Sequence, residues 1–162
     1  MTLRAPFPWF GGKRRAAERI WAALGNPDHY VEPFCGSAAV LLARPDPARC
    51  ETINDADGMV SNFWRAIRSA PDAVAEWADW PVNEVDLHAR HLWLIGQRES
   101  LTESLIANPE WCDPKAAGWW VWGACAWIGT GWCSRPSRQT PHLSDSGVGI
   151  HAPSRQLPHV GD

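Results

Sequence analysis

Three short segments of the chain combine glycines, aromatic rings and charged side chains in a way that suits a bound small molecule. The first is P-F-P-W-F-G-G-K, residues 6–13, where paired glycines let backbone N–H groups approach a ligand and Lys13 supplies a cation. The second is Y-V-E-P-F-C-G-S-A-A-V, residues 30–40, whose small residues permit close contact. The third is I-N-D-A-D, residues 53–57. Together, in this order, the three are far more specific than any one of them.

Ordinary structural roles also explain these segments. A Gly-Gly turn followed by a solvated lysine accounts for the first. Asp55 lies 23 residues beyond Glu32, near the spacing at which a nucleotide-binding βαβ unit places an acid on the ribose hydroxyls. Asp55 could equally be the N-cap of the following helix, a role that Asp57 also suits. Both interpretations of Asp55 stay open at this point.

The elements that must position these segments alternate between helix and strand. We expect a helix over residues 16–24, a strand over 29–32, a helix over 36–42, a strand over 50–54 and a helix over 59–67. Strand, helix and strand in close succession make a βαβ unit, which closes as a right-handed crossover between parallel strands. The sequence therefore predicts an α/β fold, with the ligand site at the carboxyl ends of the strands.

The second half of the chain has a different character. Longer helices are expected over residues 85–97 and 114–128, the latter with Asp113 as N-cap and Pro114 at the first helical position. Gly118 and Gly123 interrupt the apolar stretch of this last helix, which is also shorter than the roughly 18 residues that a spanning helix needs. Membrane insertion is therefore excluded.

A repeat follows these helices. The string R-Q-T-P-H-L-S-D, residues 138–145, returns as R-Q-L-P-H-V-G-D at residues 155–162, where the sequence stops inside the second copy. We therefore expect the C-terminus to be artificial or truncated. A flexible linker rich in proline and glycine also explains this segment.

Composition gives the class of the protein. The 162 residues are 45% apolar and 20% charged, which is typical of one soluble globular domain. The five cysteines form no C-x-x-C pair, and the start of the chain has no signal-peptide pattern, so we expect reduced thiols in the cytoplasm. The twelve tryptophans predict a Trp-lined surface or interior. His88 and His91 with Glu84 could mimic a metal site, but we assign no metal.

The charge is unevenly distributed along the chain. Its net value is −3, yet residues 1–19 carry five cations against Glu18 alone. Residues 129–162 are also slightly basic, and the middle of the chain is acidic. Such a chain could present a local positive face to a polyanion, although ordinary solvated charge explains the same pattern.

The motifs W-F-G-G-K, E-P-F-C-G-S-A-A-V and I-N-D resemble those of the Dam-type adenine-specific DNA methyltransferases, over roughly the first 70 positions. The resemblance implies a partial Rossmann-like fold with an added helical segment, and S-adenosylmethionine as cofactor. It implies that Trp9 and Lys13 contact the methionine end of the cofactor and that Asp55 binds the ribose. It also implies that the floor of the pocket is formed by Glu32, Pro33, Phe34 and Gly36.

The chain also departs from this family's pattern. Ala38 stands where many relatives have glycine, which predicts a slightly narrower cofactor pocket. A weaker match over residues 116–129 ends in Trp127-Ile128-Gly129, so the expected aromatic-Asn-Gly turn lacks its Asn. The catalytic Asp-Pro-Pro-Tyr motif does not occur, and the nearest string is Asp113-Pro114-Lys115.

That missing motif matters because an adenine amino group is a poor nucleophile. In the family an acidic side chain and a carbonyl accept its hydrogens while an aromatic ring stacks on the flipped base. We therefore expect this chain alone not to methylate DNA and assign no catalytic residue in it. The resemblance implies three regions: a cofactor-binding α/β core over residues 1–80, a helical segment over 81–133 that leads to the target-recognition region, and a truncated Pro/Gly-rich repeat segment over 134–162 in the place of that region.

The partner implied by the resemblance is double-stranded DNA, and a phage or other mobile element with a restriction-modification role is a fitting source. Candidate DNA contacts in the repeat are Arg138, His142, Arg155 and His159. Two further hypotheses stay open. One is a catalytically dead remnant that binds DNA or a partner protein through a Trp-rich face. The other is a nucleotide-binding oxidoreductase fragment, which the lack of G-x-G-x-x-G after the first strand disfavours.

Overall fold

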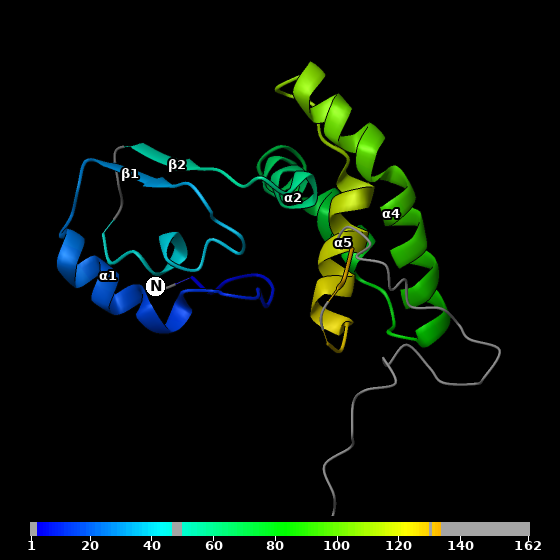
Figure 1. Cartoon of the computed structure of the whole chain (residues 1–162), viewed down its shortest axis with the longest axis horizontal. Coiled ribbons are helices and arrows are strands. Elements are labelled where there is room, and N and C mark those ends of the chain that lie inside the picture. Colours follow the sequence, from blue (N-terminus) through cyan, green and yellow to red (C-terminus); the bar gives the residue numbers. More distant parts are fainter. Residues whose placement is uncertain (1–2, 47–49, 130, 134–162) are drawn as a thin grey trace, which may run out of the picture.

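The computed structural model describes residues 3–46, 50–129 and 131–133. A short parallel sheet and one helix form one part of the molecule, and a helical bundle forms the other (Figure 1). In chain order the elements are the 3₁₀ helix η1 (Arg14–Ala16), α1 (Ala17–Leu24), β1 (His29–Glu32), the 3₁₀ helix η2 (Leu41–Ala43), β2 (Cys50–Ile53), α2 (Gly58–Ser69), α3 (Pro71–Ala78), α4 (Glu84–Ala107) and α5 (Pro114–Ala126).

The two strands are parallel, as the sequence predicts. Their register pairs His29 with Cys50 and Glu32 with Ile53. Along β1, Tyr30 and Glu32 are buried while His29 and Val31 are exposed, because side chains alternate between the faces of a strand. Tyr30 packs in a small core with Trp21 of α1, whose indole donates a hydrogen bond of 2.8 Å to the carbonyl of Val40.

The connection between the strands differs from the expected helix over residues 36–42, which is wrong. This segment forms consecutive turns that end in η2. Gly36 and Ala38 have φ angles of 47° and 50°, and the left-handed region interrupts a right-handed helix. The N–H of Leu41 bonds to the carboxylate of Glu32 at 3.2 Å. The small residues therefore build a tight turn against the end of β1 instead of a helix.

The helical bundle is built around α5, which packs against α2, α3 and α4. α3 was not predicted, although Pro71 lies at its start, where proline is well tolerated. α4 runs to Ala107 instead of Gln97, and its far half buries Leu101 and Leu105 in the core. α5 ends at Ala126, two residues before the predicted end, and Asp113 caps it as expected.

The tryptophans fill the interior and also reach the surface. Trp120 and Trp122 are buried in α5, whereas Trp80 is 53% exposed. Trp119 lies between two cations, with the guanidinium of Arg90 4.9 Å and the ammonium of Lys115 4.4 Å from its ring centroid. Within the ranges that the structure describes, no helix has the length and apolar character needed to cross a bilayer.

Candidate functional site

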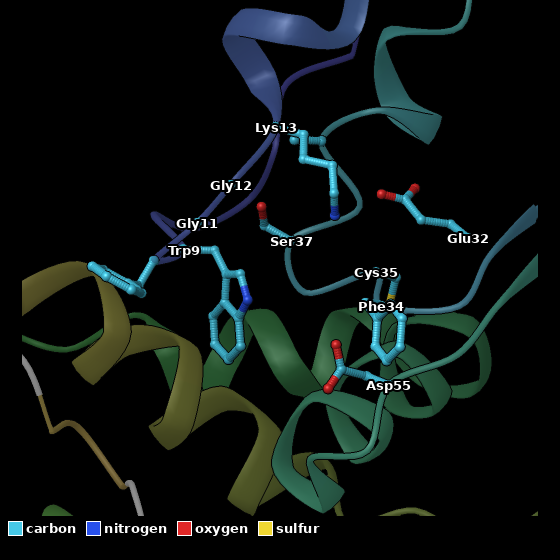
Figure 2. Close-up of a pocket in the computed structure, with 11 residues that line it drawn as sticks. Trp9, Gly11, Gly12, Lys13, Glu32, Phe34, Cys35, Ser37 and Asp55 are labelled. Atoms are coloured by element: carbon cyan, nitrogen blue, oxygen red, sulfur yellow. The ribbon is translucent and has the colours of Figure 1, made fainter. Parts of the chain in front are cut away.

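A cavity of about 290 Å³ lies where β1 and β2 end (Figure 2). All three motifs contribute to its wall, although they are far apart in the sequence. The lining residues are Trp9, Phe10, Gly11, Gly12, Lys13, Glu32, Phe34, Cys35, Ser37, Ala39 and Asp55. Of the residues predicted to bind a cofactor, the structure therefore brings together Trp9, Lys13, Glu32, Phe34 and Asp55.

The glycine loop before α1 forms one wall of the cavity. The N–H of Gly12 donates to the carbonyl of Trp9 at 3.0 Å, which closes a tight turn. Gly11 has a φ of 75° and nothing within 4 Å of where a Cβ would lie, so its backbone is open to a ligand. Lys13 follows the turn, and its ammonium points into the cavity toward Glu32 (Figure 2).

Gly36 supports the cavity from behind and does not line it. Its N–H donates to Oδ2 of Asp55 at 2.9 Å, and its carbonyl accepts from the indole of Trp64 at 2.9 Å. A Cβ at Gly36 would lie 2.4 Å from the Trp9 ring. Pro33 likewise lies outside the lining, and its carbonyl accepts from the Asn54 side chain. The predicted floor residues Pro33 and Gly36 thus shape the site without facing the cavity.

The two acids of the third motif have separate roles. Asp57 is the N-cap of α2 and accepts a hydrogen bond of 2.9 Å from the N–H of Met59. Asp55 accepts from the N–H groups of Gly36 and Asp57, which fixes its carboxylate at the cavity wall. The capping role therefore belongs to Asp57, and Asp55 joins the third motif to the second.

Glu32 is a buried carboxyl at the cavity, with 6% of its surface exposed. Burial raises its pKa, while the N–H of Leu41 and the charge of Lys13 oppose that rise. Tyr30 lies beside it, and burial together with the nearby Glu32 charge raises the pKa of Tyr30 to about 12. Cys35 is held as a thiol because burial, with Asp55 and Glu32 nearby, raises its pKa to about 11.

Several lining residues were not singled out from the sequence. These residues are Phe10, Cys35, Ser37 and Ala39. All four lie inside the first two motifs, so their position in a motif was the only sequence feature that could have indicated them. Ala38 does not line the cavity, contrary to the expectation that it narrows the pocket. It is buried at a φ of 50°, so its departure from glycine affects the backbone of the turn instead.

The nearest approach to a catalytic motif serves as a helix start. Asp113 accepts a hydrogen bond of 2.9 Å from the N–H of Ala116 as the N-cap of α5, and Pro114 begins that helix. The side chain of Asn62 bonds to both the N–H and the carbonyl of Asp113. Asp113 therefore makes hydrogen bonds that start α5 and join it to α2.

Two other sets of predicted residues have different outcomes. His91 is buried against the rings of Trp127 and Trp132, at centroid distances of 4.8 and 5.2 Å, so it packs in the bundle. The candidate DNA contacts Arg138, His142, Arg155 and His159 lie outside the described residues, as does the whole repeat.

Comparison with known proteins agrees with the motifs. Residues 9–81 match the family model described as D12 class N6 adenine-specific DNA methyltransferase. This range includes W-F-G-G-K, E-P-F-C-G-S-A-A-V and I-N-D, so the resemblance inferred from those motifs is confirmed there. No curated protein and no solved structure matches the chain.

Proposed function

Because residues 9–81 match the D12 class of N6 adenine-specific DNA methyltransferases, we propose that the chain carries the cofactor-binding part of such an enzyme. The reaction is transfer of a methyl group from S-adenosylmethionine to the exocyclic amine of adenine in DNA. The observation that carries the proposal is the convergence of three separate motifs on one cavity at the carboxyl ends of parallel strands. In this proposal β1 and β2 belong to a Rossmann-like sheet.

The chemistry of the cavity fits this cofactor. Lys13 offers a cation to the carboxylate at the methionine end, and Trp9 beside it offers an aromatic wall. Phe34 is 73% exposed and lines the cavity, so it also offers an aromatic ring to a ligand. Asp55 has its carboxylate fixed at the wall, where it can accept from ribose hydroxyls. The volume of about 290 Å³ lies near the lower end of the range of roughly 300–1,000 Å³ for ligand pockets.

Bound S-adenosylmethionine would supply an activated methyl group, and the acceptor amine needs separate help. The 162 residues contain no Asp-Pro-Pro-aromatic motif, and Asp113 is used as a helix cap. We therefore propose that this chain binds the methyl donor and does not methylate DNA alone. Its five free cysteines fit a reducing compartment, so the cytoplasm is the proposed location.

Calorimetric titration of the chain with S-adenosylmethionine tests the proposal. A hydrogen bond to a charged group contributes about 1.5–3 kcal/mol, so Asp55→Ala should weaken binding roughly ten-fold to a hundred-fold. Lys13→Gln should also weaken binding, more strongly at low salt than at high salt. Arg14→Gln is the matched control, because Arg14 is the next residue and does not line the cavity. No binding by the wild-type chain would refute the proposal.

A second candidate is a catalytically dead remnant that binds DNA or a partner protein. It is favoured by the exposed apolar side chains on and beside the sheet, since Val31 is 60% and Phe10 94% exposed. Among the described residues the sheet has only two strands, which leaves both edges open. Binding of DNA or a partner with no detectable cofactor binding would select this candidate.

A further inference from the structure

A set of arginines around α1 has no role in holding the fold together. Arg4, Arg14, Arg15 and Arg19 are all exposed, and none has an ion pair within the part of the chain that the structure describes. Glu18 is the only acid between residues 3 and 19. The local charge is therefore strongly positive on a chain whose net charge is −3.

Other arginines show what a structural role looks like in this molecule. Arg98 pairs with Asp57 at 2.9 Å. Arg65 donates to the carbonyls of Leu105 and Asn108. The side chain of Arg44 is buried and donates to the carbonyl of Pro27 at 2.6 Å. Holding several exposed cations together without such partners costs repulsion, which an external anion would relieve.

Helical spacing gives two of these arginines a common direction. η1 continues directly into α1, so Arg15 and Arg19 are four residues apart on one face. The buried residues Ala17 and Trp21 lie on the opposite face. Arg15 and Arg19 thus point away from the core, toward solvent.

A groove lies beside this helix. Its volume is about 920 Å³, and Arg4 and Arg14 both line it. Glu18 and Asp46 also line the groove, so its interior is balanced in charge and the excess lies on the outer side of α1. Ala39 lines both this groove and the smaller cavity, and Lys13 precedes Arg14. Because Lys13 lines the smaller cavity and lies only two residues before Arg15, the start of the basic face is close to the site proposed for the methyl donor.

We propose that the outer face of α1, formed by Arg15 and Arg19, binds the phosphate backbone of double-stranded DNA, with Arg4 and Arg14 adding positive charge at the neighbouring groove. This proposal rests on the function proposed above, which makes duplex DNA the polyanion. Arginine side chains on an exposed helix reach phosphate oxygens without reading bases. The face would hold DNA beside the cavity without selecting its sequence.

Salt-dependent binding tests this face. Fluorescence anisotropy with a labelled duplex would be measured between about 50 and about 200 mM NaCl, for the full chain and for Arg15→Gln/Arg19→Gln. Each lost phosphate contact reduces the slope of log affinity against log salt by about 0.9, so the double variant should be flatter by about 1.8. The loss should be equal for duplexes of unrelated sequence. Arg68→Gln is the matched control, since Arg68 is exposed near the end of α2.

The outcomes separate this proposal from the proposed function. Three results would refute the proposed DNA-binding face. These are an unchanged salt slope in the double variant, an equal change of slope in the Arg68→Gln control, and binding to anionic vesicles but not to duplex DNA. Calorimetry on the same samples reads the cofactor site, and the double variant should keep wild-type affinity for S-adenosylmethionine. If the chain binds S-adenosylmethionine but shows no salt-dependent DNA binding, only the proposed DNA-binding face is refuted. If the salt slopes are as expected but the cofactor does not bind, only the proposed cofactor site is refuted. Circular dichroism melting confirms that both variants fold.

Discussion

The buried carboxylate of Glu32 lowers the stability of the folded protein when it is ionised, although the residue lines the candidate site. Its folded-state pKa is raised by burial above the ordinary value of 4.5, so the folded protein holds this proton more tightly than the unfolded chain. Stability therefore falls as the pH rises from 4.5 through the folded pKa. Glu32→Gln should abolish this loss of stability with rising pH and retain an acceptor for the N–H of Leu41. It should also lower the affinity for S-adenosylmethionine. Urea unfolding across this pH range tests it. The exposed Glu76→Gln is the control, and an equal pH effect there would contradict the prediction.

Gly36 is required because a side chain at this position would collide with Trp9, and a comparison of two glycine substitutions tests this. Alanine at a positive φ costs about 1–3 kcal/mol, and such a cost applies both to Gly36→Ala and to Gly25→Ala, whose φ and ψ are 70° and −141°. Only at Gly36 would the new methyl group also collide with Trp9, because the site at Gly25 has nothing within 4 Å. Gly36→Ala should thus weaken cofactor binding at least ten-fold, and Gly25→Ala should leave it unchanged. Equal affinities in calorimetry would disprove the role of Gly36.

The motif residues show how much of the site is visible in the sequence. Lys13 and Asp55 were identified because their residue types and positions suit a ligand, Glu32 was identified through the family resemblance, and all three line the cavity. The supporting position of Gly36 behind Trp9 depends on a contact across 27 residues. No local pattern in the sequence encodes such a contact. Charged groups were therefore easier to predict than the backbone that orients them.

The helices and strands were predicted where local signals agree. α1 and α2 have strong apolar periodicity, and α5 has both an Asp cap and an N-terminal proline. The predicted helix over residues 36–42 failed because positive φ angles at Gly36 and Ala38 are set by the packing of the turn. A run of small residues is compatible with either conformation.

The close contact between α3 and α5 explains why Gly118 lies inside a helix. A Cβ there would lie 2.4 Å from the Cβ of Trp77 and 2.7 Å from the carbonyl of Val74. Gly118→Ala should therefore destabilise the protein by about 1–3 kcal/mol through overpacking. Gly96→Ala in α4 is the matched control, because nothing lies within 4 Å there. It should stabilise by about 0.5–1 kcal/mol. Thermal unfolding that ranks the two variants in the reverse order would refute this packing.

The sheet part and the helical bundle are joined by an aromatic cluster. Phe7, from the segment before the glycine loop, lies 5.2 Å from Phe63 of α2 and 4.9 Å from Trp120 of α5, between ring centroids. It also contacts Trp9 at 5.8 Å, so the same cluster backs the cavity. The wall of the proposed cofactor site is thereby built on the core of the bundle.

Because of this junction, both the stability of the fold and the binding of the proposed cofactor should depend on Phe7. Phe7 is 3% exposed, and a buried Phe→Ala change costs about 3–5 kcal/mol. Phe7→Ala should therefore lower stability by that amount and weaken cofactor binding through the loss of support for Trp9. Phe10, three residues away, is 94% exposed, so Phe10→Ala should change stability by less than about 0.5 kcal/mol. Urea unfolding of both variants decides the matter, because equal losses would mean that the sheet part is not anchored to the bundle through Phe7.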